Sequence, residues 1–192
     1  MNNADILKIL RKADALLDGH FELRSGLHSD RYFQCANVLR YPVVAQKLCE
    51  ALARKMKKKL GAKMKPDAVI SPAMGGILVG HEVAKTLKTM SIFAEKNEGK
   101  LVMHRFNIEK GKKYIVAEDV VTRGGRVQEV LDIVEQAGGK VLAIAVLVDR
   151  SGGKAKFKYP MFSLLEMEPV AHEPSECPLC IKKIPMKHPG SK

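Results

Sequence analysis

Apolar residues recur along the chain with two spacings, one typical of amphipathic helices and one typical of buried strands. The helical spacing predicts helices over residues 4–17, where Gly19 ends the run, and over residues 42–60, 77–87 and 127–136. Short apolar runs predict strands at residues 68–70, 91–93, 113–117 and 141–148, and residues 21–38 are predicted to form strands and a turn. Because strands alternate with helices, we expect an α/β fold with a mainly parallel sheet flanked by helices.

The length and composition of the chain fit a single domain. With 192 residues, 46% of them hydrophobic, the chain can bury one sizeable core. We expect this core at about residues 63–168, and a small hood formed mainly by residues 1–62 and the C-terminal tail. The sequence has no run of about eighteen apolar residues, and its first residues form no basic and then apolar leader. We therefore expect a cytoplasmic protein without a membrane span or a signal peptide.

The formal net charge of +12 is of the kind found in many nucleic-acid-binding proteins. Much of the excess lies at one helix end and the loop after it, and in the C-terminal tail: Lys55, Lys57, Lys58, Lys59, Lys63, Lys65, Lys182, Lys183, Lys187 and Lys192. Lysines in the last turn of a helix interact favourably with its dipole, so a solvated surface explains them. We expect no nucleic-acid partner, and a basic chain also suits a substrate with several phosphates.

Two of the four cysteines, Cys177 and Cys180, have the spacing of metal ligands. A tetrahedral site needs two more ligands, which would come from His172, His188 or a second subunit. Three nearby prolines favour a tight structural turn without metal instead. A disulfide between the two cysteines is not expected in a reducing compartment.

The most informative run of residues is 114–126, where an apolar strand leads to two acids, a hydroxyl, two glycines and a helical pattern. Glu118 and Asp119 lie where the strand leaves its sheet, and carboxylates there can accept hydrogen bonds from ribose hydroxyls or hold a hydrated Mg²⁺. Gly124 and Gly125 permit positive φ and close backbone approach, so that the turn can cradle a phosphate before the helix. The alternative is that the acids cap the helix and the glycines only turn the chain.

Two other segments are expected at the same edge of the sheet. Ligands of parallel α/β sheets bind beyond the carboxyl ends of the strands. Residues 74–76, 118–126 and 149–150 each follow a predicted strand. We therefore expect them to converge on one site.

These segments resemble those of a known family. Residues 114–126 resemble the phosphoribosyl-diphosphate (PRPP) motif of type I phosphoribosyltransferases, and residues 71–77 resemble their diphosphate loop. Residues 19–34, with a Ser-Gly turn and the aromatic pair Tyr32 and Phe33, resemble the N-terminal segment of orotate phosphoribosyltransferases. Residues 148–150 are similar to the segment that supplies an arginine to the orotate carboxylate. The four motifs follow the family order.

The resemblance implies a type I phosphoribosyltransferase fold with a small N-terminal hood. It implies transfer of a phosphoribosyl group from PRPP to orotate, giving orotidine 5′-monophosphate and diphosphate in pyrimidine biosynthesis. It also implies a homodimer with a loop shared across subunits, and Mg²⁺ held mainly through the substrate with no direct protein ligand. The alternatives are a phosphoribosyltransferase for a purine base and a non-catalytic regulator that senses PRPP and binds nucleic acid.

The same resemblance assigns roles to individual residues. The residues expected to bind PRPP are Arg24, Lys96, Glu118, Asp119, Val120, Val121, Thr122, Arg123, Gly124, Gly125 and Arg126. The diphosphate loop comprises Ala73, Met74, Gly75 and Gly76, and the orotate site comprises Tyr32, Phe33, Thr122 and Arg150. Lys96, Lys100 and Asp119 are the expected catalytic residues. The alternative for Tyr32 and Phe33 is ordinary strand packing, in which one of the two is a core residue and does not contact the ligand.

Two segments depart from the family pattern. In the loop at residues 94–105, Glu95 replaces an arginine and Lys96 matches the lysine beside it, so Lys100, His104 and Arg105 are alternative candidates. A polar hairpin tip is the other interpretation of this loop. In the PRPP motif, Arg123 and Arg126 replace hydroxyl residues. Arg126 could strengthen the anion site or fill it, and we expect an intact site.

Overall fold

The computed structural model describes residues 1–23, 25–61, 64–167 and 170–188. The chain divides into two compact units, a smaller one of Met1–Val38 with Glu168–Lys192 and a larger one of Leu39–Met167. Within the described residues, no helix is both long enough and apolar enough to cross a membrane.

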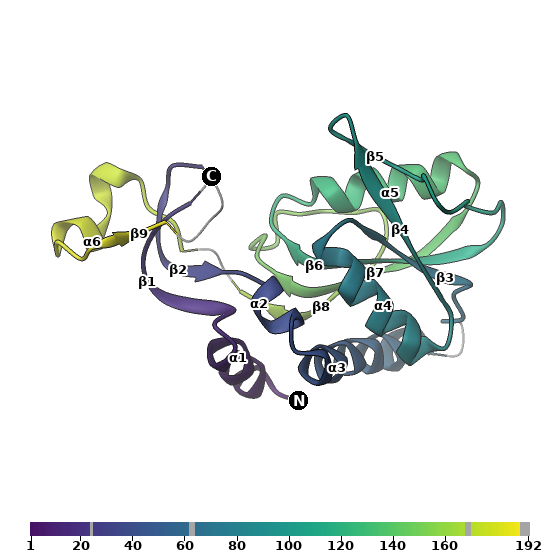
Figure 1. Ribbon diagram of the computed structural model, residues 1–192, viewed down its shortest axis with the longest axis horizontal. Coiled ribbons are helices and arrows are strands. Elements are labelled where there is room, and N and C mark those ends of the chain that lie inside the picture. The colour runs from purple at the N-terminus through teal and green to yellow at the C-terminus, as the bar shows by residue number, and fades with distance from the viewer. Residues whose placement is uncertain (24, 62–63, 168–169, 189–192) are drawn as a thin grey trace. The chain divides into compact units, whose positions relative to one another are not determined.

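The larger unit is built on a six-stranded sheet (Figure 1), with the strand order β5-β4-β3-β6-β7-β8. Its strands are β3 (Ala68–Pro72), β4 (Met90–Asn97), β5 (Lys100–Val102), β6 (Lys113–Val121), β7 (Lys140–Asp149) and β8 (Met161–Glu166). All neighbours are parallel except β4 and β5. The helices of this unit are α3 (Pro42–Leu60), α4 (Gly75–Leu87) and α5 (Gly125–Gln136). The predicted α/β fold with a mainly parallel sheet is confirmed.

Helices cover both faces of this sheet. The buried face of α5 packs with the inner residues of β3, β6 and β7, among them Ile70, Val116 and Ile144. Figure 1 shows α3 and α4 on the opposite side of the sheet from α5, and both pack against its strands. Two covered faces explain why the central strands are continuous apolar runs, without the alternation of a half-exposed sheet.

The boundary between the two units differs from the one expected near residue 62. Helix α3 belongs to the larger unit, because it packs against α4, β7 and β8. Its apolar stripe, which includes Leu48, Leu52 and Met56, is fully buried. The lysines in its last turn, Lys57–Lys59, are exposed as expected. The N-terminal part of the smaller unit therefore ends at Val38.

The smaller unit combines both ends of the chain. Its elements are α1 (Asn3–Lys12), β1 (Leu16–Glu22), β2 (His28–Phe33), η2 (Pro174–Glu176), α6 (Pro178–Ile181) and β9 (Met186–Lys187), and α2 (Ala36–Leu39) spans the boundary with the larger unit. The strand order is β2-β1-β9, with β1 and β2 antiparallel and β9 parallel to β1. Its buried apolar residues include Ile6, Leu10, Phe21 and Phe33.

Helix α1 is shorter than predicted, because the chain turns after Lys12. The Asp14 N–H donates to the Arg11 carbonyl at 3.0 Å, and the Ala15 N–H donates to the Leu10 carbonyl at 2.8 Å. These two bonds form a Schellman cap in which Asp14, at φ +52°, takes the left-handed position usually held by glycine. The prediction that the helix continues to residue 17 and ends at Gly19 was wrong, since Gly19 lies inside β1.

Candidate active site

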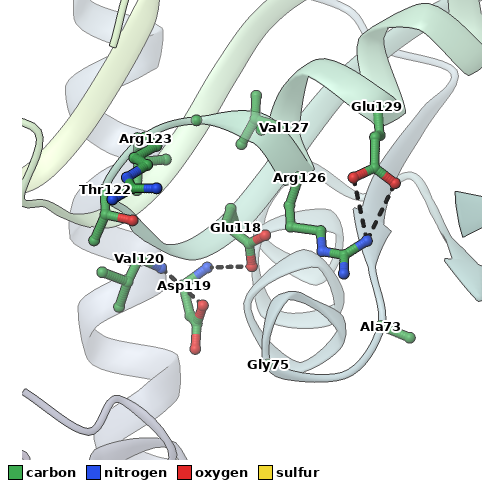
Figure 2. A pocket seen from close by; sticks show the side chains of 13 residues that line it. Ala73, Gly75, Glu118, Asp119, Val120, Thr122, Arg123, Arg126, Val127 and Glu129 are labelled. Carbon is green, nitrogen blue, oxygen red and sulfur yellow. Dashed lines mark hydrogen bonds and ion pairs between the residues drawn. The ribbon is translucent and has the colours of Figure 1, made fainter. Parts of the chain in front are cut away.

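The larger unit has a cavity of about 520 Å³ where β6 ends and where α4 and α5 begin. Figure 2 shows that the side chains of Glu118 and Asp119 enter it from β6, close to Gly75. Its lining comprises Ala73, Gly75, Glu118, Asp119, Val120, Val121, Thr122, Arg123, Gly124, Gly125, Arg126, Val127 and Glu129. The structure thus brings together most of the residues predicted for the PRPP motif and the diphosphate loop.

Two helix N-termini meet at this cavity. Helix α4 begins at Gly75 and α5 begins at Gly125, and neither N-cap residue makes a side-chain hydrogen bond. The first N–H groups of a helix have no intrahelical partner, and the helix dipole places partial positive charge there. Gly124, at φ +81°, provides the sharp turn from β6 into α5. Each end is therefore suited to binding an anion such as a phosphate.

The acid pair lies between these two helix ends, with Glu118 buried and Asp119 half-buried. The Asp119 N–H donates to Oε1 of Glu118 at 3.0 Å, and the Val120 N–H donates to Oδ1 of Asp119 at 2.8 Å. Burial, and after it the neighbouring Asp119 carboxylate, raises the pKa of Glu118 to about 9. Burial also raises the pKa of Asp119. Such a pair favours a partner that donates hydrogen bonds or brings positive charge to the cavity.

The start of α4 is packed closely against the two acids. A Cβ atom on Gly75 would collide with Oδ2 of Asp119, and one on Gly76 would lie 2.9 Å from Oε1 of Glu118. Only glycine leaves room for the carboxylates at these two positions. The glycines of the predicted diphosphate loop therefore also position the acid pair.

The side chain of Arg126 turns away from the phosphate turn toward Glu129. Its Nη1 donates to Oε1 and Oε2 of Glu129 at 3.2 and 3.1 Å. Glu129 also accepts the Leu101 N–H at 3.2 Å. Arg126 and Glu129 thus form an ion pair within the lining of the cavity (Figure 2). The lining residues Val127 and Glu129 were not predicted, although the spacing of Arg126 and Glu129 is that of a helical ion pair.

The residues predicted to bind orotate fall in different places. Phe33 is only 7% exposed in the core of the smaller unit, and Tyr32 is half-buried with its ring 5.7 Å from that of Phe21. Of this aromatic pair, Tyr32 has the more exposed ring. Arg150 directly follows β7, and its N–H donates to the Val121 carbonyl at 2.8 Å. It lies at the cavity edge of the sheet but outside the cavity lining. The predicted phosphate ligand Arg24 lies outside the described residues.

The loop at residues 94–105 contains an antiparallel hairpin, as in the alternative interpretation. Lys96 pairs with Leu101, and Glu98 and Gly99 form the turn with φ +47° and +88°. Figure 1 shows the β4–β5 hairpin projecting beyond the rest of the sheet. Lys96, Lys100 and His104 are exposed, whereas Arg105 binds Glu95 at 2.9 Å. None of these residues lines the cavity.

Replacement of Glu118 with glutamine is expected to stabilise the empty protein, and more so at higher pH. The raised pKa means that the folded protein prefers the protonated form of Glu118. The contribution of this protonated acid to the stability of the fold is complete below about pH 4.5 and is lost as the pH rises toward about 9. Glutamine stays neutral, so the gain in stability should grow as the pH rises across this window. Thermal unfolding at pH 5 and pH 8 measures it, with the exposed Glu109→Gln as control. An equal shift at both pH values would contradict the prediction.

Comparison with known proteins identifies the family of the chain. Residues 39–179 match the phosphoribosyl transferase domain family. The chain is 47% identical over its full length to the complete orotate phosphoribosyltransferase of Heliobacterium modesticaldum.

Solved structures share the fold. Orotate phosphoribosyltransferase from Aeropyrum pernix superposes with a TM-score of 0.69 at 24% identity, over 84% of this chain and 93% of that one. Adenine phosphoribosyltransferase from Rhodothermus marinus superposes with a TM-score of 0.66 at 19% identity, over 86% and 100%. The same fold thus occurs in phosphoribosyltransferases that are named for different bases. The sequence similarity over the full length of the chain distinguishes between these groups. The chain belongs to the phosphoribosyl transferase family and, within it, to the orotate phosphoribosyltransferases.

Proposed function

We propose that the protein transfers the 5-phosphoribosyl group of PRPP to orotate, releasing diphosphate and forming orotidine 5′-monophosphate. The observation that carries this proposal is the single cavity with two uncapped helix N-termini and an acid pair between them. PRPP carries a 5′-phosphate, a 1-diphosphate and a ribose diol between them. The two phosphate-bearing ends of PRPP therefore match the two helix N-termini, and its ribose diol matches the acid pair between them.

Each part of the cavity takes one task in the reaction. The turn of residues 122–126 binds the 5′-phosphate, and the loop of residues 73–76 binds the diphosphate. Glu118 and Asp119 accept hydrogen bonds from the ribose hydroxyls. Cleavage of the anomeric C–O bond builds positive charge on the ribose and negative charge on the leaving diphosphate. The protein acts mainly by positioning the reactants and stabilising this charge.

Magnesium is part of the proposal, held mainly through the substrate. The acid pair fits a nearby hydrated cation, because burial disfavours the charged carboxylates and a cation beside them would offset that cost. When bound, Mg²⁺ neutralises the diphosphate and makes it a better leaving group. We also propose a cytoplasmic homodimer that acts in the biosynthesis of pyrimidine nucleotides.

Substituting Lys96 with alanine is expected to lower the turnover number while orotate binding changes little. Lys96 is exposed on the projecting hairpin, from which it would reach the diphosphate of the partner subunit as negative charge develops there. Steady-state kinetics measures the effect, and the exposed Lys8→Ala serves as control. Mixing the Lys96→Ala and Asp119→Asn variants should restore activity, because some hybrid dimers then hold one intact site. If subunits exchange and activity does not return, the hairpin does not act across the interface.

Substituting Arg150 with alanine is expected to raise the Michaelis constant for orotate and to weaken the preference for orotate over uracil. Uracil lacks the carboxylate, so it cannot form the charge-assisted hydrogen bonds that Arg150 would donate to orotate. The Michaelis constant for PRPP should change little, and Arg54→Ala on α3 is the control for loss of an arginine charge. If Arg150→Ala retains the parent affinity for orotate, Arg24 or Arg31 is the next candidate for the carboxylate contact.

An absorbance assay tests the proposed reaction directly. Orotate consumption is followed with PRPP and Mg²⁺, beside adenine, hypoxanthine and uracil. We expect turnover of orotate alone. Turnover of a purine without orotate would assign the enzyme to purine bases. Salt-sensitive nucleic-acid binding that responds to PRPP, without turnover of any base, would favour the regulator.

A further inference from the structure

Four side chains of the smaller unit direct nitrogen and sulfur atoms toward one point. They belong to His20, His28, Cys177 and Cys180, and one ligand atom of each lies within 4.8 Å of all the others. Three of the four residues are buried, and Cys180 is exposed. All four residues belong to the smaller unit, and none of them lines the cavity of the larger unit.

Local structure brings these side chains to the same side. The pairing of β1 with β2 is irregular between Asp18 and Phe21, and this bulge leaves the consecutive residues His20 and Phe21 both buried. His28 comes from the start of β2. Cys177 caps α6, and Cys180 lies one turn later in that helix, so both thiols face the two histidines.

The hydrogen bonds of His20 fix which of its nitrogens faces the cluster. Its Nδ1 lies 2.8 Å from the carbonyl oxygen of Ile184, so Nδ1 carries the proton and donates it there. The lone pair of Nε2 therefore points into the cluster. Metal-binding histidines commonly hold their second nitrogen in this way, with an N–H bonded to a backbone carbonyl.

Hydrogen bonding alone does not account for the contacts around that lone pair. Nε2 of His20 lies 3.1 Å from Nδ1 of His28 and 3.7 Å from the sulfur of each cysteine. A single lone pair accepts one good hydrogen bond, yet three candidate donors surround it. Nδ1 of His28 in turn lies 3.2 Å from the Cys180 sulfur. One cation at the centre would satisfy all four atoms together.

The spacing of these atoms matches tetrahedral zinc. Zinc bonds of ~2.0 Å to nitrogen and ~2.3 Å to sulfur give tetrahedron edges of roughly 3.3 Å between nitrogens and roughly 3.6 Å between nitrogen and sulfur. The corresponding distances of 3.1, 3.2, 3.7 and 3.7 Å lie within about 0.4 Å of these edges. Two thiolates would also balance the charge of the ion.

The C-terminal segment buries few apolar side chains. Among the described residues 170–188, Cys177 is the only buried one. The apolar side chains of Ile181, Ile184 and Met186 are 74%, 39% and 39% exposed. Strand β9 comprises only Met186–Lys187. Small units without a sufficient apolar core commonly rely on a metal or a disulfide, and both thiols here are free.

We propose that His20, His28, Cys177 and Cys180 bind one Zn²⁺ ion, which fastens the C-terminal segment to β1 and β2. Four protein ligands leave no open position for water, so the ion is structural. The other candidate ligands, His172 and His188, do not belong to this cluster. The backbone of His172 exchanges hydrogen bonds with that of His28, and the His188 ring binds Glu22 at 3.1 Å. The preferred interpretation of the two cysteines as a turn without metal is replaced by this proposal.

Metal analysis of the untagged full-length protein tests the site. Protein purified with reductant from zinc-supplemented cells is expected to contain about one zinc ion per chain. Removal of zinc with a chelator should lower the melting temperature and speed tryptic cleavage at the exposed Lys182 and Lys183. Replacement of zinc by Co²⁺ should produce the visible bands of tetrahedral cobalt and a thiolate-to-cobalt charge-transfer band.

Matched variants distinguish this site from adventitious binding. Cys180→Ser removes an exposed thiol and should abolish stoichiometric zinc and weaken the charge-transfer band. His188→Gln changes a histidine of the same segment outside the cluster and should retain both. If the Cys180→Ser variant does not fold, the cobalt spectrum of the parent protein and its response to the chelator test the proposal without it. A parent protein that takes up no zinc and melts identically with chelator overturns the proposal. The proposal is also overturned if the parent protein contains stoichiometric iron in place of zinc, or if the Cys180→Ser variant retains its zinc.

Discussion

Replacing Asp119 with asparagine is expected to lower the rate of orotidine monophosphate formation by about tenfold or more. Asp119 lies in the cavity between the two helix N-termini, where its carboxylate would accept a hydrogen bond from a ribose hydroxyl. A hydrogen bond to a charged group contributes about 1.5–3 kcal/mol, and about 1.4 kcal/mol corresponds to a factor of ten. The Michaelis constant for PRPP should rise as well.

Stability separates this effect from misfolding. Burial raises the pKa of Asp119, so removal of its charge should leave the melting temperature unchanged or higher. Asp132→Asn on the exposed side of α5 removes the same charge away from the cavity and should keep full activity. A parent-like rate and PRPP constant in Asp119→Asn would exclude this acid from the site.

Replacing Gly124 with alanine is expected to reduce both activity and stability. Gly124 is at φ +81°, where an alanine costs about 1–2 kcal/mol. Its Cβ would also lie 2.6 Å from the Phe157 ring, so the turn before α5 must shift. A shift of this turn moves the N–H groups that cradle the 5′-phosphate, and we expect a loss of activity of at least about tenfold.

Gly111→Ala is the matched control for this change. Gly111 is also at φ +81°, but a Cβ there would meet no atom within 4 Å, and the residue lies outside the cavity lining. The Gly111→Ala variant should lose stability only through the unfavourable φ angle, and its kinetic constants should equal those of the parent protein. Phe157→Leu combined with Gly124→Ala should recover part of the lost stability. Equal activity of the Gly111 and Gly124 variants would mean that the turn does not position the phosphate.

The sequence was sufficient to predict the core of the larger unit and its cavity. Apolar runs between helical patterns identified strands β3, β4, β6 and β7 in order, because both faces of a parallel sheet are covered. Glu118, Asp119 and the glycines after them were recognisable because acids and glycines at the end of an apolar strand have few structural reasons to occur together. Parallel topology then places the loops after β3 and β6 at one edge.

Other features depend on contacts that no local pattern encodes. The end of α1 is set by an aspartate in a conformation that usually indicates glycine. His20 is buried because of a bulge, which breaks the alternation by which strand faces are predicted. The assignment of α3 to the larger unit follows from packing against β8, a strand that was not predicted. His20 and His28 are more than half the chain away from Cys177, so spacing alone could not identify them as its partners.

The pairing of β1 with β9 imposes an order on folding during synthesis. His20 lies opposite Met186, so the N-terminal strand leaves the ribosome long before its last neighbour does. Leu39–Met167 lies between the two and can fold first. Until β9 arrives, His20 and Phe21 present unpaired backbone groups on that side of β1, which can join the same strand of another nascent chain. A truncation before Met186 would leave these groups exposed in the finished protein and is expected to favour aggregation.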